Sequence, residues 1–360
     1  MPIDYVVDEP HRGAIGDLRP FQMSGFEGLR CIMFGELPGP PPSRMFGSRV
    51  TDVGLGKATF SMPVTKWLED GFGLIWAGIY ALFADAPLGT ALWTGLPAGK
   101  TATTSELNMS FLRPVTGETT DLIGRAETIH LSRQVGLSSI HITDQNGRLL
   151  AYGSTKCLIA DVPVDPEAEL PPADTGPDDP PDPYLREAPP REAYVPTNDI
   201  INGVPIEIQR GTLDGSIAFP IWRTTGLRPT SVEDGEVTMS LPTSPWFSNG
   251  GPAVYGGTLA WLADHVMGAS VYSTLGPGDV FGTLDLNVRF MRPAMINSGD
   301  LQARGEVTHR GNRLRMASAE IVDAAGKKAA MATSSVLLFP GGVRDFVRGR
   351  SLEEIIATQT

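Results

Sequence analysis

The sequence is poor in residues that crosslink small secreted domains or bind metal ions. It contains only two cysteines in 360 residues, Cys31 and Cys157, which show neither a pairing pattern nor metal-ligand spacing. None of its five histidines belongs to a His-x-x-x-His or Cys/His cluster. We therefore expect reduced, structural cysteines and no metal site.

The sequence also lacks an excess of positive charge and any long apolar run. Its formal net charge of −12 and its pI of about 4.9 argue against a nucleic-acid backbone or an anionic membrane surface as the main partner. No apolar stretch is long enough to span a bilayer, and residues 1–9 lack the basic and apolar regions of a signal peptide. We expect a soluble, cytoplasmic protein.

What the sequence does contain is a long internal repeat. Residues 108–114 (NMSFLRP) return as residues 287–293 (NVRFMRP), at an offset of 179 positions. The same offset relates further identical residues: Pro63 and Pro242, Trp67 and Trp246, Gly71 and Gly250, Gly78 and Gly257, Asp85 and Asp264, Gly89 and Gly268, and His130 and His309. A period this long predicts two whole domains, each with its own core.

The two copies are separated by a segment rich in proline and acidic residues, from Asp161 to about Pro196. Proline withholds backbone donors and like charges repel, so this segment should run as an extended connector whose role is spacing. We therefore divide the chain into an N-terminal tail (1–20), a first domain (21–160), an acidic linker (161–197), a second domain (198–340) and a C-terminal tail (341–360).

Each copy shows the same order of patterns. A short alternating strand, 58–62 or 237–241, ends at a proline. A segment that is apolar nearly all round follows, 74–83 or 253–271, and predicts a buried helix. Four strand-like runs come next, at about 282–291, 301–309, 313–322 and 328–338 in the second copy. The simplest solution is an α+β fold in which an antiparallel sheet curls around one long helix.

One acidic residue stands in each otherwise apolar helix. Asp85 and Asp264 occupy equivalent positions, where an ionised carboxylate is costly unless it is solvated or hydrogen-bonded. That cost indicates a cavity, although a carboxylate that caps a neighbouring backbone group or pairs with an arginine would give the same pattern. The glycine-rich helix starts supply free N–H groups and let a substrate carbonyl approach closely.

The segment 249–264 (NGGPAVYGGTLAWLAD), with the strand ending in residues 290–293 (FMRP), resembles the hotdog-fold acyl-CoA thioesterases of the phenylacetate-degradation type. Asn249, Gly256, Gly257 and Asp264 fill the family pattern, with Tyr255 where the family usually has histidine. The resemblance implies a tandem double hotdog whose copies pack as a pseudo-dimer, and a homodimer of the whole chain. It also implies hydrolysis of an acyl-CoA or related thioester to a carboxylic acid and a thiol, with no cofactor.

The resemblance further implies two composite sites, in which the helix start of one copy faces the acid of the other. The first would join Asp85 to Asn249, Tyr255 and Gly256, and the second would join Asp264 to Asp70, Trp76 and Ala77. Family members often carry a hydroxyl about eighteen residues after the acid. Thr103 holds that place after Asp85, whereas Gly282 holds it after Asp264, with Thr283 adjacent.

We therefore expect one working site per chain, centred on Asp85, with the site at Asp264 degenerate or reused for binding. In the working site Asp85 would act as general base or as nucleophile, the Gly256 N–H would stabilise the oxyanion, and Asn249 would orient the water or the carbonyl. Tyr255, Gly257, Trp76 and Thr283 are expected to contact the substrate. Arg313 and Arg315, with Arg310, form a basic cluster that would bind the phosphates of coenzyme A or merely cover a solvated strand face.

Two other functions are compatible with the pattern. A noncatalytic acyl-CoA or lipid binder would keep the pocket without turnover, and the missing histidine and the altered second motif favour it. A hydratase or dehydratase acting on enoyl-CoA would need a histidine near the helix. His265 follows Asp264, but it is expected to face another side of the helix, and the first copy has Ala86 at the equivalent position.

Overall fold

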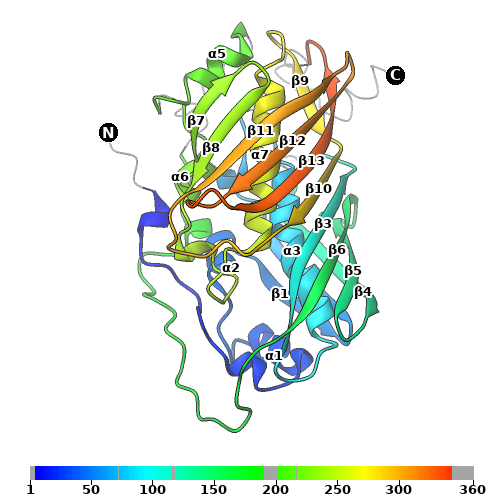
Figure 1. Ribbon diagram of the computed structural model, residues 1–360, viewed down its shortest axis with the longest axis vertical. Coiled ribbons are helices and arrows are strands. Elements are labelled where there is room, and N and C mark those ends of the chain that lie inside the picture. The colour runs from blue at the N-terminus through cyan, green and yellow to red at the C-terminus, as the bar shows by residue number, and fades with distance from the viewer. Residues whose placement is uncertain (1–4, 72, 116–117, 190–201, 216, 343–360) are drawn as a thin grey trace.

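The computed structural model describes residues 5–71, 73–115, 118–189, 202–215 and 217–342 (Figure 1). The first copy comprises α1 (Gly25–Met33), α2 (Pro41–Phe46), β1 (Arg49–Gly54), β2 (Lys57–Pro63), α3 (Gly78–Trp93), β3 (Lys100–Phe111), β4 (Asp121–Leu131), β5 (Val135–Thr143) and β6 (Leu149–Asp161). The second comprises α5 (Pro205–Arg210), α6 (Pro220–Thr225), β7 (Arg228–Glu233), β8 (Glu236–Leu241), α7 (Gly256–Tyr272), β9 (Val280–Thr283), β10 (Asp285–Phe290), β11 (Leu301–Arg310), β12 (Leu314–Val322) and β13 (Lys328–Phe339).

The described strands of both copies form one antiparallel sheet. Its order is β1-β2-β4-β5-β6-β3-β10-β13-β12-β11-β8-β7, and β9 pairs with β13. The copies join where β3 pairs with β10, with Asn108 opposite its own equivalent, Asn287. Glu106 lies opposite Arg289 and Ser110 opposite Asp285, a self-complementary register that places a local two-fold axis between the two asparagines. The internal repeat is therefore also a structural symmetry.

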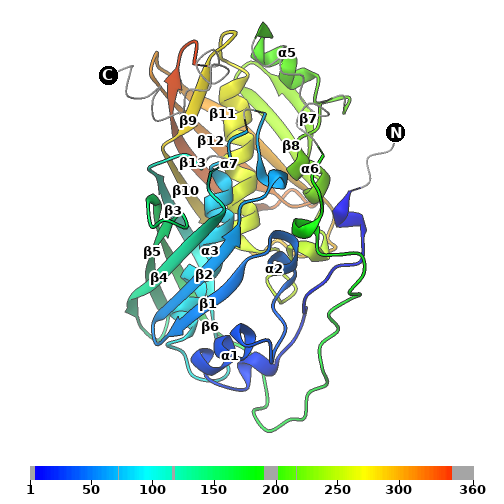
Figure 2. The ribbon, with the colours of Figure 1, turned by 180° about the vertical axis from the view of Figure 1, so that it is seen from behind.

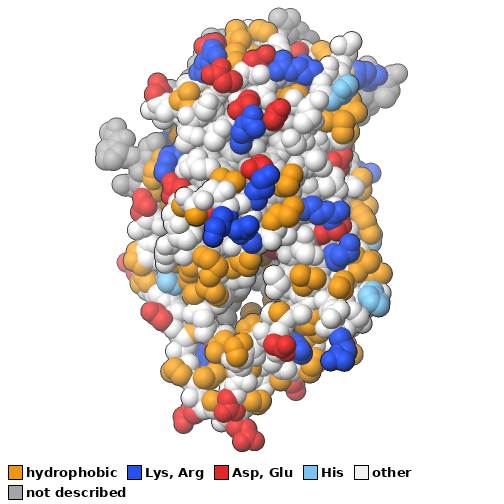
Figure 3. Space-filling view, viewed as in Figure 1, with side chains coloured by type: hydrophobic (Ala, Val, Ile, Leu, Met, Phe, Trp, Pro, Cys, Tyr) orange, Lys and Arg blue, Asp and Glu red, His pale blue; other side chains and the backbone are white. Residues whose placement is uncertain are grey.

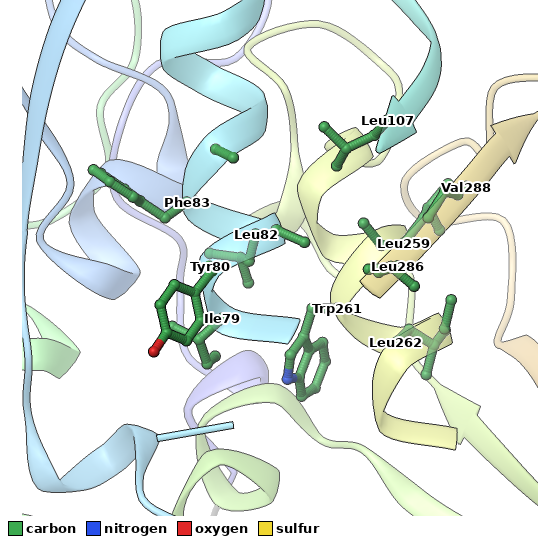
Figure 4. Close-up of a cluster of buried hydrophobic side chains, with 14 of the residues drawn as sticks. Ile79, Tyr80, Leu82, Phe83, Leu107, Leu259, Trp261, Leu262, Leu286 and Val288 are labelled. Carbon is green, nitrogen blue, oxygen red and sulfur yellow. The ribbon is translucent and has the colours of Figure 1, made fainter. Parts of the chain in front are cut away.

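Each half of the sheet curls around one long helix, α3 or α7, and the two helices pack against each other (Figures 1 and 2). Their side chains are buried on nearly all faces, as expected for a helix enclosed by a sheet and a second helix. Figure 4 shows Ile79 and Leu82 of α3 close to Trp261 of α7, with Leu286 of β10 beyond them. This architecture confirms the predicted α+β tandem double hotdog.

The predicted helix of the first copy is wrong at both ends. Residues 74–83 were expected to be helical, but α3 covers Gly78–Trp93 and continues past Pro87. Ile75 instead forms an isolated bridge with Glu69 before the helix begins. The predicted strand 282–291 is likewise divided, into β9 and β10, on either side of Leu284.

The linker is extended but attached to the domains. In its described part, residues 161–189, one short 3-10 helix (Pro183–Leu185) is present. Gln22 Nε2 donates to the carbonyl oxygens of Asp165 and Ala168, both at 2.8 Å, and Arg186 forms two hydrogen bonds with Glu9, at 2.6 and 2.7 Å. The linker therefore runs along the N-terminal segment of the chain, where the Gly13 N–H donates to the Thr175 carbonyl oxygen at 3.0 Å (Figure 1).

The described part of the predicted N-terminal tail, residues 5–20, is packed as well. Val6 and Val7 are buried, and the Arg12 side chain lies over the Trp246 ring at 5.7 Å and donates to Asp182 Oδ1 at 3.3 Å. These residues connect the start of the chain to the second copy and to the end of the linker. The C-terminal tail from residue 343 onward lies outside the described residues.

The outer face of the sheet carries charges of both signs (Figure 3). Arg304 Nε donates to Glu236 Oε1 at 2.8 Å, and Lys328 Nζ lies 2.7 Å from Glu320 Oε2. Such exposed pairs contribute little to stability, but they interrupt any continuous basic surface. Among the described residues, no helix is long and apolar enough to cross a membrane.

Candidate active site

The two acidic residues of the central helices each face the helix start of the other copy. The Gly257 N–H at the start of α7 donates to Asp85 Oδ2 at 2.9 Å. The Gly78 N–H at the start of α3 donates to Asp264 Oδ2 at 2.7 Å. The structure thus brings together helix starts and acids from different copies. Each carboxylate also lies at the positive end of a helix dipole.

A threonine hydroxyl completes the surroundings of each acid. Thr104 Oγ1 donates to Asp85 Oδ1 at 2.8 Å, and the Thr283 side chain forms a hydrogen bond with Asp264. Thr283 and Thr104 are equivalent at the offset of 179 positions. Thr103, the residue that was expected to supply the hydroxyl, has an exposed side chain instead, because successive residues of a strand face opposite sides. The second site has therefore not lost its hydroxyl.

Both acids are buried deeply enough to take up protons near neutral pH. Burial raises the pKa of Asp85 to about 6, against hydrogen bonds from Thr104 and Gly257 that lower it. Burial raises the pKa of Asp264 to about 7, against hydrogen bonds from Gly78 and Thr283 that lower it. Carboxyl groups with such pKa values can accept and return a proton at physiological pH.

A cavity lies beside the second acid. A cavity of about 230 Å³ reaches Asp264, with walls from the start of α3 (Trp76, Ala77), from α7 (Gly268, Tyr272) and from β9 (Phe281). Its lining does not include Asp85 or the residues around it, Thr104, Tyr255, Gly256 and Gly257. The sequence favoured Asp85, whereas the cavity lies beside Asp264.

The packing of the first helix of each copy, α1 or α5, explains the space beside Asp264. In the first copy α1 lies directly on Trp93: a Cβ atom at Gly25 would lie 1.9 Å from the Trp93 carbonyl oxygen, and one at Gly28 would lie 2.7 Å from its ring. The equivalent positions of the second copy are Val204 and Glu207. Helix α5 therefore cannot approach α7 in the same way.

Equivalent apolar side chains of α1 and α5 also lie in different surroundings. Leu29 of α1 is in the hydrophobic core, at 2 % exposure. Its counterpart Ile208 of α5 lines the cavity beside Asp264. The space that α1 fills in the first copy thus remains open in the second.

This explanation predicts that bulk at Gly28 destabilises the protein. We expect Gly28→Val to lower the free energy of unfolding by about 2–3 kcal/mol, because the new side chain must displace Trp93 or the backbone at Pro20. Glu207→Val, at the equivalent exposed position, should change it by less than about 0.5 kcal/mol. Urea denaturation of both variants measures the difference. Equal losses would show that the contact of α1 with Trp93 is not tight.

The remaining predicted residues of the Asp85 site hold its framework together. Asn249 Oδ1 accepts the Gly251 N–H at 2.9 Å, and the Tyr255 hydroxyl donates to the Leu82 carbonyl oxygen at 2.9 Å. Burial, followed by the charge of Asp85, raises the pKa of Tyr255 well above its usual value. A Cβ atom at Gly256 would lie 2.7 Å from Asp85 Oδ2, so a larger residue there would have to displace the carboxylate.

The predicted phosphate-binding arginines do not line the cavity. The Arg315 side chain donates to Thr274 Oγ1, Arg310 Nη1 donates to Asp234 Oδ2 at 2.9 Å, and Arg313 is exposed. Arg113, which the sequence gave no role in the site, has an exposed side chain and does line the cavity.

His265 is the other cavity residue that the sequence reasoning set aside. It lines the same cavity as Asp264. The sequence contained one sign of a special role for His265: it is a histidine in the second copy where the first copy has Ala86. Among the described residues, no group of three or more His, Cys, Asp or Glu side chains is placed to hold a metal ion.

Both repeats match the sequence profile of the thioesterase superfamily, over residues 72–151 and 251–330. A candidate esterase of Halobacterium salinarum is 35% identical to this chain over 103 residues, which cover 27% of this chain and 66% of that protein. The match therefore spans just under two thirds of that relative.

Several solved structures match most of this chain. A hot dog fold protein of unknown function from Alicyclobacillus acidocaldarius has a TM-score of 0.52 and 15% identity, and the match covers 80% of this chain and 95% of that one. An acyl-CoA thioesterase II from Mycobacterium marinum has a TM-score of 0.50 and 12% identity, covering 82% and 97%. At these identities the likeness shows a shared fold.

Proposed function

We propose, on the premise that both repeats belong to the thioesterase superfamily, that this protein hydrolyses an acyl-CoA or a related thioester at the composite site around Asp264. The observation that carries the proposal is the cavity of about 230 Å³ whose lining includes Asp264. An acyl group bound there would place its thioester carbonyl beside the carboxylate and the start of α3. The name of the Mycobacterium marinum protein supports acyl-CoA as the substrate class.

The proposed roles follow from the contacts of Asp264. The carboxylate, oriented by the Gly78 N–H and Thr283, removes a proton from water, and the resulting hydroxide attacks the thioester carbon. The oxyanion that forms lies near the backbone of Ala77, at the positive end of α3, which is the counterpart of the Gly256 position predicted for the other site. Collapse of this intermediate breaks the C–S bond, and protonated Asp264 returns its proton to the thiolate.

A covalent route uses the same geometry. Asp264 would attack the thioester carbon directly, release the thiol and leave an anhydride that water then hydrolyses. Both routes need an ionised Asp264 and the same oxyanion donors. In either of them Arg113, exposed at the cavity wall, is positioned better than Arg313 or Arg315 to bind a coenzyme A phosphate. The homodimer implied by the resemblance remains a prediction, which light scattering can test.

The rate should depend on pH through Asp264. Because its pKa of about 7 governs the fraction of the active, ionised form, we expect kcat/KM to rise about tenfold per pH unit below that value and to level off above it. Free-thiol release measured from pH 5 to 9 gives the profile. Asp85→Asn, which removes the other buried carboxyl group, should leave its midpoint unchanged. A rate that falls as pH rises from 6 to 8 would instead indicate a catalytic acid.

A further inference from the structure

One wall of the cavity beside Asp264 is a cluster of aromatic rings around His265. Trp76, Phe219, Trp222 and His265 all line the cavity. The Trp76 and His265 rings are 4.3 Å apart between centroids, and Trp76 meets Phe219 edge-on at 5.3 Å. Trp261 packs against His265 at 5.5 Å from behind the lining.

This cluster belongs to the second site alone. The equivalent positions of the Asp85 site are Tyr255, Pro40, Ser43 and Ala86. All four residue types differ, whereas the acid, the threonine and the helix-start glycine are the same in both sites. The cluster therefore has a role that is separate from that of the acid, glycine and threonine shared by the two sites.

The proton of His265 is fixed by its neighbour. The Trp222 indole N–H donates to His265 Nε2 at 2.8 Å, so Nε2 carries no proton and the hydrogen of the neutral ring is on Nδ1. Burial lowers the pKa of His265 to about 3, which keeps the ring neutral at physiological pH. His265 is thus a fixed N–H donor and cannot act as a general acid through Nε2. This argues against the hydratase alternative.

Two N–H donors in this wall have no acceptor in the part of the chain that the structure describes. They are His265 Nδ1 and Trp76 Nε1, and neither nitrogen is open to water, in the cavity or outside the protein, so a ligand oxygen reaches them only when the two rings shift on binding. His265 itself is 2 % exposed. A buried donor without an acceptor is energetically unfavourable. An apolar ligand would leave both N–H groups without an acceptor.

We propose that Trp76 and His265 form a subsite for a hydrogen-bond acceptor, so that the acyl group of the substrate carries an oxygen atom, as a keto, hydroxyl or ether group, that reaches this wall. The inference rests on the proposed function in one respect, that the cavity takes the acyl group. Trp222 is a positioning residue, because it acts only by holding the tautomer of His265. A site that hydrogen-bonds an oxygen atom of the substrate discriminates between substrates more strongly than an apolar pocket discriminates between chains that differ by one methylene group.

The test uses acyl groups of equal size. An apolar cavity of about 150 Å³ holds benzene, so this one accommodates about eight heavy atoms. The probes are octanoyl-CoA and its analogues in which one methylene, from carbon 4 onward, is replaced by an ether oxygen, which is an acceptor only. We expect one position of the oxygen to raise kcat/KM about tenfold relative to its neighbours, through one or two additional hydrogen bonds.

Variants assign this preference to its residues. Trp76→Phe should abolish the preference, which is measured as the ratio of kcat/KM for the ether analogue to kcat/KM for octanoyl-CoA, because the ring then has no N–H to donate. Trp222→Phe should weaken it, since His265 Nε2 no longer accepts a hydrogen bond. The matched control is Trp261→Phe, which removes another buried, unpartnered indole N–H from a residue that does not line the cavity. It should keep the preference.

Non-hydrolysable thioether analogues of the same series separate this inference from the proposed function. Hydrolysis of every member at similar rates, with equal dissociation constants for the thioethers, would overturn the subsite and leave the thioesterase standing. A position-dependent preference in thioether binding without any hydrolysis would retain the subsite and overturn the proposed function. A preference that Trp261→Phe removes as completely as Trp76→Phe would also contradict the subsite.

Discussion

Asp264→Asn is expected to lower kcat/KM for thioester hydrolysis by about 10²- to 10⁴-fold, the range in which a positioned general base contributes. The amide has nearly the same shape as the carboxyl group and can still accept the Gly78 N–H, which donates to Asp264 Oδ2 at 2.7 Å. It cannot accept a proton from water or attack a carbonyl. The loss should therefore be in kcat, and it is measured by free-thiol release at pH 8.

The matched control for this variant is Asp85→Asn. Asp85 has the same contacts, from Gly257 and Thr104, but it does not line the cavity. We expect its kcat/KM to stay within about threefold of the wild type. Loss of activity in Asp85→Asn with retention in Asp264→Asn would move the working site to Asp85. Circular dichroism of both variants checks that the fold is intact.

Gly268→Leu is expected to lower kcat/KM for octanoyl-CoA by about 10²-fold, because the cavity is then occupied by a side chain. Gly268 lies one turn after Asp264 on α7 and lines the cavity. A Cβ atom there would meet only the Phe281 ring, at 3.4 Å, so the leucine can be accommodated without breaking the helix. Acetyl-CoA, whose acyl group is smaller, should lose much less.

The chain contains an internal control for this variant. Gly89 is the equivalent residue on α3, and a Cβ atom there would have nothing within 4 Å. Gly89→Leu should leave activity unchanged and raise the stability slightly, since leucine favours a helix more than glycine does. Equal loss of activity in the two variants would show that the cavity at Gly268 does not receive the acyl group.

The fold was predictable because the repeat and the helix pattern agree. Two helices that are apolar on all faces, each followed by strands at the same offset, leave few ways to bury them. The boundaries of α3 were not predictable in this way. Proline usually ends a helix, and yet α3 contains Pro87 and continues to Trp93.

The partners of the two acids were predictable only in part. The repeat identified Asp85 and Asp264, and the resemblance placed each of them opposite the other copy's helix start. The hydroxyl was misplaced by one residue, at Thr103 instead of Thr104, because the register of a strand cannot be counted from a distant helix. That shift was one of the reasons why the Asp264 site looked incomplete.

The choice between the two sites depended on packing outside the motif. The gain of Trp76 and the loss of one glycine at Ala77 suggested a degenerate second site. The structure shows both residues in the wall of the cavity. The decisive difference lies in the first helix of each copy. Gly25 and Gly28 let α1 pack tightly on Trp93, and α5 has no glycine at the equivalent positions. A comparison of the two copies at those positions could have indicated it, but only once α1 was known to cover Trp93.

The most direct test of the working site is a crystal structure of the protein with the thioether analogue of octanoyl-CoA bound. We expect the acyl chain to lie in the cavity, with the carbon that replaces the thioester carbonyl next to Asp264 and the start of α3. An acyl chain bound beside Asp85 and the start of α7, with the cavity at Asp264 left without ligand, would contradict this expectation.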